Sequence, residues 1–131
     1  MTQHVERRNV ALGISGSIAA YKSAELARIF VQRGYNVRVV MTESAKEFIS
    51  PLTLQAVSGN PVSTGLWDES ESHGIGHISL ADWADVFLIA PATADCIAKA
   101  TAGFADNALL ASLLATKAPI VVAPAMNVNM Y

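Results

Sequence analysis

The sequence has a single cysteine, few charged residues and no basic tract, and each shortage excludes a class of protein. One cysteine, Cys96, cannot form an intramolecular disulfide or a cysteine-based metal site. The net charge is −2 and no basic run extends beyond Arg7-Arg8, which argues against nucleic acid as a partner. The N-terminus lacks the apolar core of a signal peptide, and every apolar run is shorter than the roughly 18 residues of a membrane helix. We therefore expect a cytoplasmic protein without a metal, nucleic-acid or membrane partner.

Apolar residues are abundant by contrast. They make up 52% of the 131 residues, and the mean hydropathy is +0.35. The length predicts one domain with a substantial core. The apolar runs are short and are broken by glycine, proline and aspartate. This composition favours a soluble α/β domain that is buried on several sides and that also buries surface in an oligomer.

Four short apolar runs predict β-strands, at residues 9–14, 35–41, 85–90 and 119–123. Helical patterns lie between them, at 17–33, 42–50, 51–59, 78–84 and 93–116, the last broken near Gly103. Residues 60–77 predict a long loop with at most a short strand around Pro61–Val62. The alternation predicts one α/β domain over residues 1–131, a Rossmann or flavodoxin-like three-layer αβα fold with a mostly parallel sheet.

Ligands of such folds bind beyond the carboxyl ends of the strands, which here are followed by residues 13–17, 42–44, 91–96 and 124–127. The first loop, "GISGS", has two glycines for a tight turn, hydroxyls at Ser15 and Ser17, and a helix start that offers N–H groups to an anion. It is neither a GxGxxG motif nor a P-loop, so a tight turn without a ligand remains an alternative.

The second and third loops are equally ambiguous. Ser44 suits a helix cap or a phosphate contact, and Thr93 and Asp95 suit helix caps or hydrogen bonds to a planar ligand. Cys96 comes early in its helix, where a thiol pKa is lowered, but a cysteine flanked by apolar residues is more often simply packed.

Two further polar residues stand out. His77 follows a glycine-containing loop and precedes an apolar segment, which suits a general base or a surface residue. Asn127, in "PAMN", suits a turn or an amide that orients a carboxylate. The pattern alone does not choose between these roles.

Five segments considered together resemble a known family: "GISGSIAAYK", "VMTESAKEFI", "GHISLADWAD", "APATADCIAKATAGFADN" and "PAMNVNMY". They are similar to the homo-oligomeric flavin-containing cysteine decarboxylases, above all to the branch that serves bacterial coenzyme A synthesis. The resemblance covers residues 9–131. It implies a carbon–carbon lyase that uses FMN to decarboxylate 4'-phosphopantothenoylcysteine to 4'-phosphopantetheine. Peptidyl-cysteine decarboxylation in lantibiotic maturation and a non-catalytic flavin-binding regulatory subunit are the alternatives.

The resemblance also implies residue roles. The FMN phosphate would be held by Gly16, Ser17, Ile18 and Ser44. The flavin would contact Thr93, Ala94, Asp95, Cys96 and the Ala125 backbone. His77 would be the active-site base, and Asn127 would bind the substrate carboxylate. Many members of the family carry asparagine at the position of Asp95, which leaves open how this acid contacts the cofactor.

The resemblance finally implies partners and a longer protein. We expect a homotrimer, or a dodecamer built from trimers, with FMN at the subunit boundary. The family's proton-donor cysteine lies in a substrate-covering loop after "PAMN", and a phosphopantothenate–cysteine ligase domain is fused in the bifunctional members. We therefore expect residues 1–131 to be a flavoprotein domain that ends before both.

Overall fold

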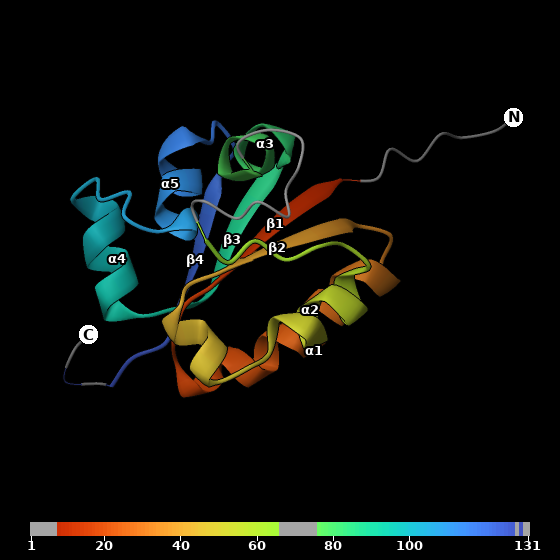
Figure 1. Ribbon diagram of the computed structural model, residues 1–131, viewed down its shortest axis with the longest axis horizontal. Coiled ribbons are helices and arrows are strands. Elements are labelled where there is room, and N and C mark those ends of the chain that lie inside the picture. The colour runs from red at the N-terminus through yellow and green to blue at the C-terminus, as the bar shows by residue number, and fades with distance from the viewer. Residues whose placement is uncertain (1–7, 66–75, 128, 130–131) are drawn as a thin grey trace, which may run out of the picture.

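The computed structural model describes residues 8–65, 76–127 and 129, without the side chains of residues 76–78. A parallel sheet forms its centre (Figure 1). The strands are β1 (Asn9–Ile14), β2 (Asn36–Met41), β3 (Val86–Ala92) and β4 (Ile120–Pro124), in the order β2-β1-β3-β4. Each strand is parallel to its neighbours. The strand order reverses beside β1, because β2 lies on one side of it and β3 on the other, and ligands bind at such switch points.

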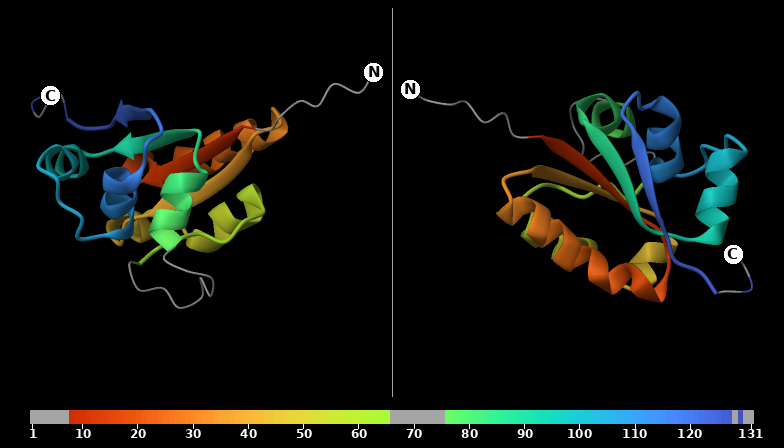
Figure 2. Two further views of the ribbon diagram at one scale, coloured as in Figure 1. Left: turned by 90° about the horizontal axis from the view of Figure 1, so that it is seen from above. Right: turned by 180° about the vertical axis from the view of Figure 1, so that it is seen from behind.

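Helices cover both faces of the sheet, which confirms the predicted three-layer αβα fold (Figure 2). The helices α1 (Tyr21–Gln32) and α2 (Pro51–Ser58) lie on one face. The helices α3 (Gly76–Trp83), α4 (Ala94–Thr101) and α5 (Ala108–Ala115) lie on the other. Strand β1 serves both cores, since Ala11 packs in the α3/α5 cluster whereas Leu12 and Ile14 pack in the α1/α2 cluster.

Short local signals explain where the helices begin and end. Helix α2 begins with Pro51 after Ser50, whose hydroxyl accepts a hydrogen bond from the Leu52 N–H, and it ends at Gly59, which has φ +74°. Gly103, with φ +79°, follows α4, and the Asn107 side chain accepts the Leu110 N–H at the start of α5. The predicted break near Gly103 is therefore confirmed.

Three predicted boundaries are wrong by a few residues. The helix predicted from residue 17 begins as a short 3-10 turn, η1 (Ile18–Ala20). Residues 42–50 contain only the 3-10 turn η2 (Ser44–Glu47), and a helix could not continue through Ser50, which takes the extended conformation that a residue before proline favours. The loop predicted over residues 60–77 ends earlier, since Gly76 and His77 already belong to α3. Residues 66–75 of that loop lie outside the described residues.

The sequence allowed at most a short strand around Pro61–Val62. In the part of the loop that the structure describes, residues 60–65, the strand is reduced to an isolated bridge between Ser63 and Val40. No helix among the described residues is long and apolar enough to cross a membrane.

Strand β4 is exposed along its length, with side chains such as Ile120, Val121 and Val122 at 46%, 50% and 41% exposure.

Candidate functional site

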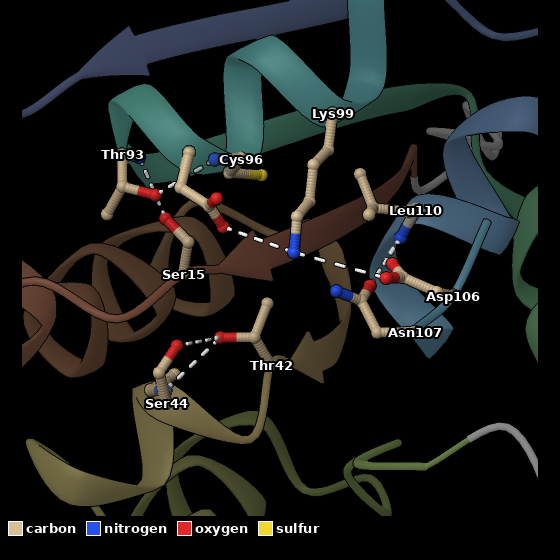
Figure 3. Close-up of polar contacts among 11 residues, drawn as sticks. Ser15, Thr42, Ser44, Thr93, Cys96, Lys99, Asp106, Asn107 and Leu110 are labelled. Carbon is tan, nitrogen blue, oxygen red and sulfur yellow. Dashed lines mark hydrogen bonds and ion pairs between the residues drawn. The ribbon is translucent and has the colours of Figure 1, made fainter. Parts of the chain in front are cut away.

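The loops after β1 and β3 are joined through Ser15, which is 2% exposed (Figure 3). Its hydroxyl donates a hydrogen bond to the Pro91 carbonyl oxygen and accepts one from the Thr93 N–H at 3.0 Å. The Ser15 N–H also donates to the Pro91 carbonyl oxygen, at 3.2 Å. The turn that starts at Gly16 is thereby fixed next to the start of α4.

The loops after β1 and β2 meet at Gly16 and Ser44. A Cβ atom at Gly16 would lie 2.5 Å from Ser44 Oγ and 2.9 Å from the Ser44 backbone carbonyl carbon. Only glycine permits this approach. The Ser44 hydroxyl lies 3.2 Å from Thr42 Oγ1, which also accepts the Ala45 N–H at 3.1 Å. Two residues that the sequence analysis assigned to one phosphate site are therefore in contact.

The turn itself carries hydrogen-bond donors. Ser17 begins η1, and its hydroxyl oxygen accepts the Ala19 N–H at 3.1 Å. The N–H groups of Gly16 and Ile18 have no recorded partner in the part of the chain that the structure describes, and Ile18 is 77% exposed. In the neighbouring loop, Glu43, which directly precedes Ser44, is paired with Lys46 at 2.9 Å. Such a set of neutral donors suits an anion.

The segment after β3 starts α4. Thr93 is the N-cap, and its Oγ1 accepts the Cys96 N–H at 3.1 Å. Ala94 is the first residue of the helix and is half-buried. The exposed carboxylate of Asp95 lies 3.6 Å from the Lys99 ammonium group, which also lies 3.9 Å from Asp106 (Figure 3).

Cys96 packs in the core cluster with α5 and is 5% exposed. Burial raises the pKa of its thiol, and the Asp95 carboxylate raises it further, although Lys99 opposes them. These effects outweigh the lowering expected at a helix start. Of the two alternatives for Cys96, the environment in the structure therefore favours a packed thiol over a reactive thiolate.

The loop after β4 is tied to β3, because the Ala125 N–H donates to the Ala92 carbonyl oxygen at 2.9 Å. Ala125 also lines a pocket of about 320 Å³ between α1 and the ends of β3 and β4. The pocket is lined by Ala19, Lys22, Ser23, Leu26, Ala90, Pro91, Ala123, Pro124 and Ala125. Asn127 is exposed, and its Oδ1 accepts the Asn129 N–H at 2.8 Å, as in an Asx turn.

The structure thus brings together part of the expected site. It joins Gly16 to Ser44 directly and joins their turn to Thr93 through Ser15. It places the backbone of His77 in the first turn of α3, while the histidine side chain lies outside the described residues. The linking role of Ser15 was missed, although a serine directly before the glycine of a strand-ending turn was the available signal.

The known proteins that this chain is similar to agree with one another. The flavoprotein family matches residues 1–131. The coenzyme A biosynthesis bifunctional protein CoaBC of Vibrio cholerae is 57% identical over 129 residues, which are 98% of this chain and 32% of that protein. CoaBC of Escherichia coli K12 is 54% identical over 124 residues, 95% of this chain and 30% of that protein. The chain therefore spans about a third of the length of these relatives.

Two solved structures that are similar to this chain are decarboxylases. The FMN-dependent cysteine decarboxylase SpaF has a TM-score of 0.85 and 35% identity, covering 95% of this chain and 71% of that one. A mutant of PPC decarboxylase complexed with pantothenoylaminoethenethiol has a TM-score of 0.81 and 35% identity, covering 95% and 70%. The chain belongs to the flavoprotein family, and its resemblance to the flavin-containing cysteine decarboxylases is confirmed.

Proposed function

We propose that the chain binds FMN at the carboxyl edge of its sheet and is the part of a coenzyme A biosynthesis enzyme that decarboxylates 4'-phosphopantothenoylcysteine. The contact between Gly16 and Ser44 carries this proposal, since it unites two loops whose residues correspond to a phosphate site in the family. The similarity to CoaBC and to PPC decarboxylase supports the choice of substrate.

The residues present fit the phosphate of FMN. The Ser17 and Ser44 hydroxyls and the N–H groups of Gly16 and Ile18 are neutral donors at the starts of η1 and η2, and Glu43, the acid directly before Ser44, is paired with Lys46. A dianionic phosphate is stabilised by such donors and by the positive end of the helix dipole. Gly16, Ser17, Ile18 and Ser44 would hold the phosphate.

The residues assigned to the flavin lie on the neighbouring strand ends. Thr93, Ala94, Asp95 and Cys96 form the first turn of α4, and Ala125 follows β4. Because the Cys96 thiol is buried in the core, we assign its flavin contact to the backbone of that turn. The Ala92–Ala125 hydrogen bond keeps the two segments together.

The chemistry that bound FMN supplies is the two-electron oxidation of the terminal cysteine, which gives the departing carboxylate an electron sink. The chain's own contribution is to hold the substrate and to move protons. Asn127 would donate from its amide to the substrate carboxylate, and His77 would act as the base. Both roles rest on the correspondence of these residues to the family's motifs.

Direct measurement can test the proposal. The purified chain should be yellow or should take up added FMN, and the flavin should be released on denaturation. The full-length enzyme supplied with FMN should release CO₂ from 4'-phosphopantothenoylcysteine. A chain that takes up no FMN would refute the cofactor, and a flavin-loaded enzyme without CO₂ release would refute the reaction.

A second substrate class has structural support. The FMN-dependent cysteine decarboxylase TvaF from thioviridamide biosynthesis is similar in fold, with a TM-score of 0.86 at 26% identity, which favours peptidyl-cysteine decarboxylation as the second candidate. Offering the enzyme 4'-phosphopantothenoylcysteine and a peptide with a C-terminal cysteine distinguishes the two. We expect turnover of the first, because identity to CoaBC is higher, at 57%.

We further propose a trimer, or a dodecamer built from trimers, and a fused ligase domain in the longer protein. Large apolar side chains that are exposed in the single chain support the oligomer, because an interface would bury them. They include Ile18 at 77%, Leu52 at 70% and Leu114 at 66% exposure. The relatives are named as bifunctional proteins, and this chain spans about a third of their length, which supports the fusion. Light scattering that found only monomers of the full-length enzyme would refute the oligomer.

A further inference from the structure

Ser15 connects two loops that the proposed cofactor would have to contact at once. We propose that Ser15 is a positioning residue, which holds the turn at Gly16–Ile18 at a fixed distance from the first turn of α4 so that one FMN molecule can contact both. This inference rests on the proposed FMN site. It concerns a side chain to which the family's motifs gave no role.

The hydrogen bonds between β1 and β3 show that the Ser15 hydroxyl takes the place of a backbone carbonyl as acceptor. In a parallel ladder, a residue donates its N–H to one residue of the neighbouring strand and accepts at its carbonyl from the residue two further along. Ser15 completes the first half, since its N–H donates to the Pro91 carbonyl oxygen. The Thr93 N–H, however, donates to the Ser15 hydroxyl at 3.0 Å instead of the carbonyl. The side chain therefore prolongs the ladder while the backbone already turns away at Gly16.

The same hydroxyl also donates to the Pro91 carbonyl oxygen, so it acts as a donor and an acceptor at once. At 2% exposure, water cannot readily replace either bond. Thr93 is the N-cap of α4, and its position fixes where that helix begins. One buried side chain thus sets the distance between the phosphate turn and the α4 turn.

The benefit of this spacing depends on the ligand. FMN would contact the first turn through its phosphate and the second through its ring, so its affinity depends on both being held in place before it binds. Riboflavin has the ring but no phosphate, and its affinity depends far less on the distance between the turns. Loss of the Ser15 hydroxyl should therefore weaken FMN binding more than riboflavin binding.

The chain offers a matched control in Ser23 of α1. This serine is also 2% exposed, and its hydroxyl donates to the Ala90 carbonyl oxygen at 2.8 Å, one residue before the acceptor of Ser15. Among the described residues it accepts no recorded hydrogen bond from the α4 turn. Ser23→Ala removes a similar buried hydrogen bond without cutting the link between the two turns.

The test is a fluorescence titration of the wild type, Ser15→Ala and Ser23→Ala with FMN and with riboflavin. We expect Ser15→Ala to raise the Kd for FMN about tenfold, because FMN must then restore the spacing that one buried hydrogen bond had fixed, and the Kd for riboflavin less than about threefold. Ser23→Ala should leave the ratio of the two Kd values at its wild-type level. An unchanged ratio in Ser15→Ala, or an equal change in both serine variants, would overturn the inference.

Two further outcomes are separable. A wild type that binds no FMN refutes the proposed function and the inference with it, whereas normal wild-type binding with an unchanged Ser15→Ala ratio refutes only the inference. Thermal melts of both variants check that they fold. If Ser15→Ala does not fold, Ser15→Cys is titrated by the same criterion, because a thiol fills the space but is a weak hydrogen-bond donor and acceptor.

Discussion

Replacing Gly16 by alanine should separate the β1 and β2 loops. The new Cβ would lie 2.5 Å from Ser44 Oγ, 2.6 Å from Ser44 Cβ and 2.9 Å from the Ser44 carbonyl carbon. Carbon atoms normally pack at about 3.5–4.0 Å, so the loops must separate by about 1 Å. The backbone carbon cannot rotate away as a side-chain end can. The substitution therefore displaces η2, which Ser44 begins.

The strain of such overpacking is about 1–3 kcal/mol. If the FMN complex carried all of it, the Kd for FMN would rise about 5-fold to 150-fold. We expect at least about a tenfold rise, since the phosphate would lose its contact with either Ser44 or the Gly16 turn. Flavin fluorescence measures the Kd, and a thermal melt checks that the variant is folded.

Two other glycines provide controls. Gly65→Ala places its Cβ in open space, with nothing within 4 Å, and should change neither stability nor FMN binding. Gly13→Ala points its Cβ at Leu109 Cδ1, in the core, and should lower the melting temperature without changing the FMN affinity of the folded chain. A folded Gly16→Ala variant that binds FMN as tightly as the wild type would refute the assignment of this turn to the phosphate.

Three other predictions concern His77, Asn127 and Cys96. His77→Asn should keep FMN binding but abolish CO₂ release by the full-length enzyme, and wild-type turnover would remove His77 from the mechanism. Asn127→Asp should weaken binding of 4'-phosphopantothenoylcysteine several-fold, because the new carboxylate repels the substrate carboxylate. FMN binding is the internal control, and an unchanged substrate affinity would contradict the proposed role of the Asn127 amide. The raised pKa of the Cys96 thiol leaves less thiolate at pH 8, so iodoacetamide should modify the native chain more slowly than the urea-unfolded chain, and the native rate should increase with pH. Equal rates for native and unfolded chains would contradict the burial of this thiol.

The strands and helix ends could be predicted because their signals are local. A short apolar run between turn residues predicts a strand of a parallel sheet even where, as in β4, the strand is exposed in this chain, and all four strands were found within two residues of the predicted bounds. Gly34, Gly59 and Gly103 adopt positive φ values directly after or near the ends of helices, where a side chain would be strained. Such signals need no knowledge of the rest of the chain.

The connections within the site could not be predicted, because they join residues far apart in the sequence. Ser15 and Thr93 are separated by 78 positions. The same holds for the buried hydrogen bond from Ser23 to Ala90, outside the two ligand turns, which spans 67 positions. A buried serine on a helix looks like an ordinary small residue until its acceptor is known. Likewise, the glycine at position 16 suggested a turn, but the sequence could not show that Ser44 lies against it.

The capping and ligand-binding roles that the sequence left open are compatible in this structure. Ser17, Thr93 and Asn127 each accept a backbone N–H through a side-chain oxygen, as caps and turns require. Accepting leaves their O–H and N–H groups available, and no hydrogen bond donated by these side chains is recorded among the described residues. A phosphate, a flavin carbonyl or a carboxylate needs donors. Each side chain can therefore fix its own loop with its acceptor and bind a ligand with its donor, so a cap at the carboxyl edge of this sheet is no argument against a role in binding.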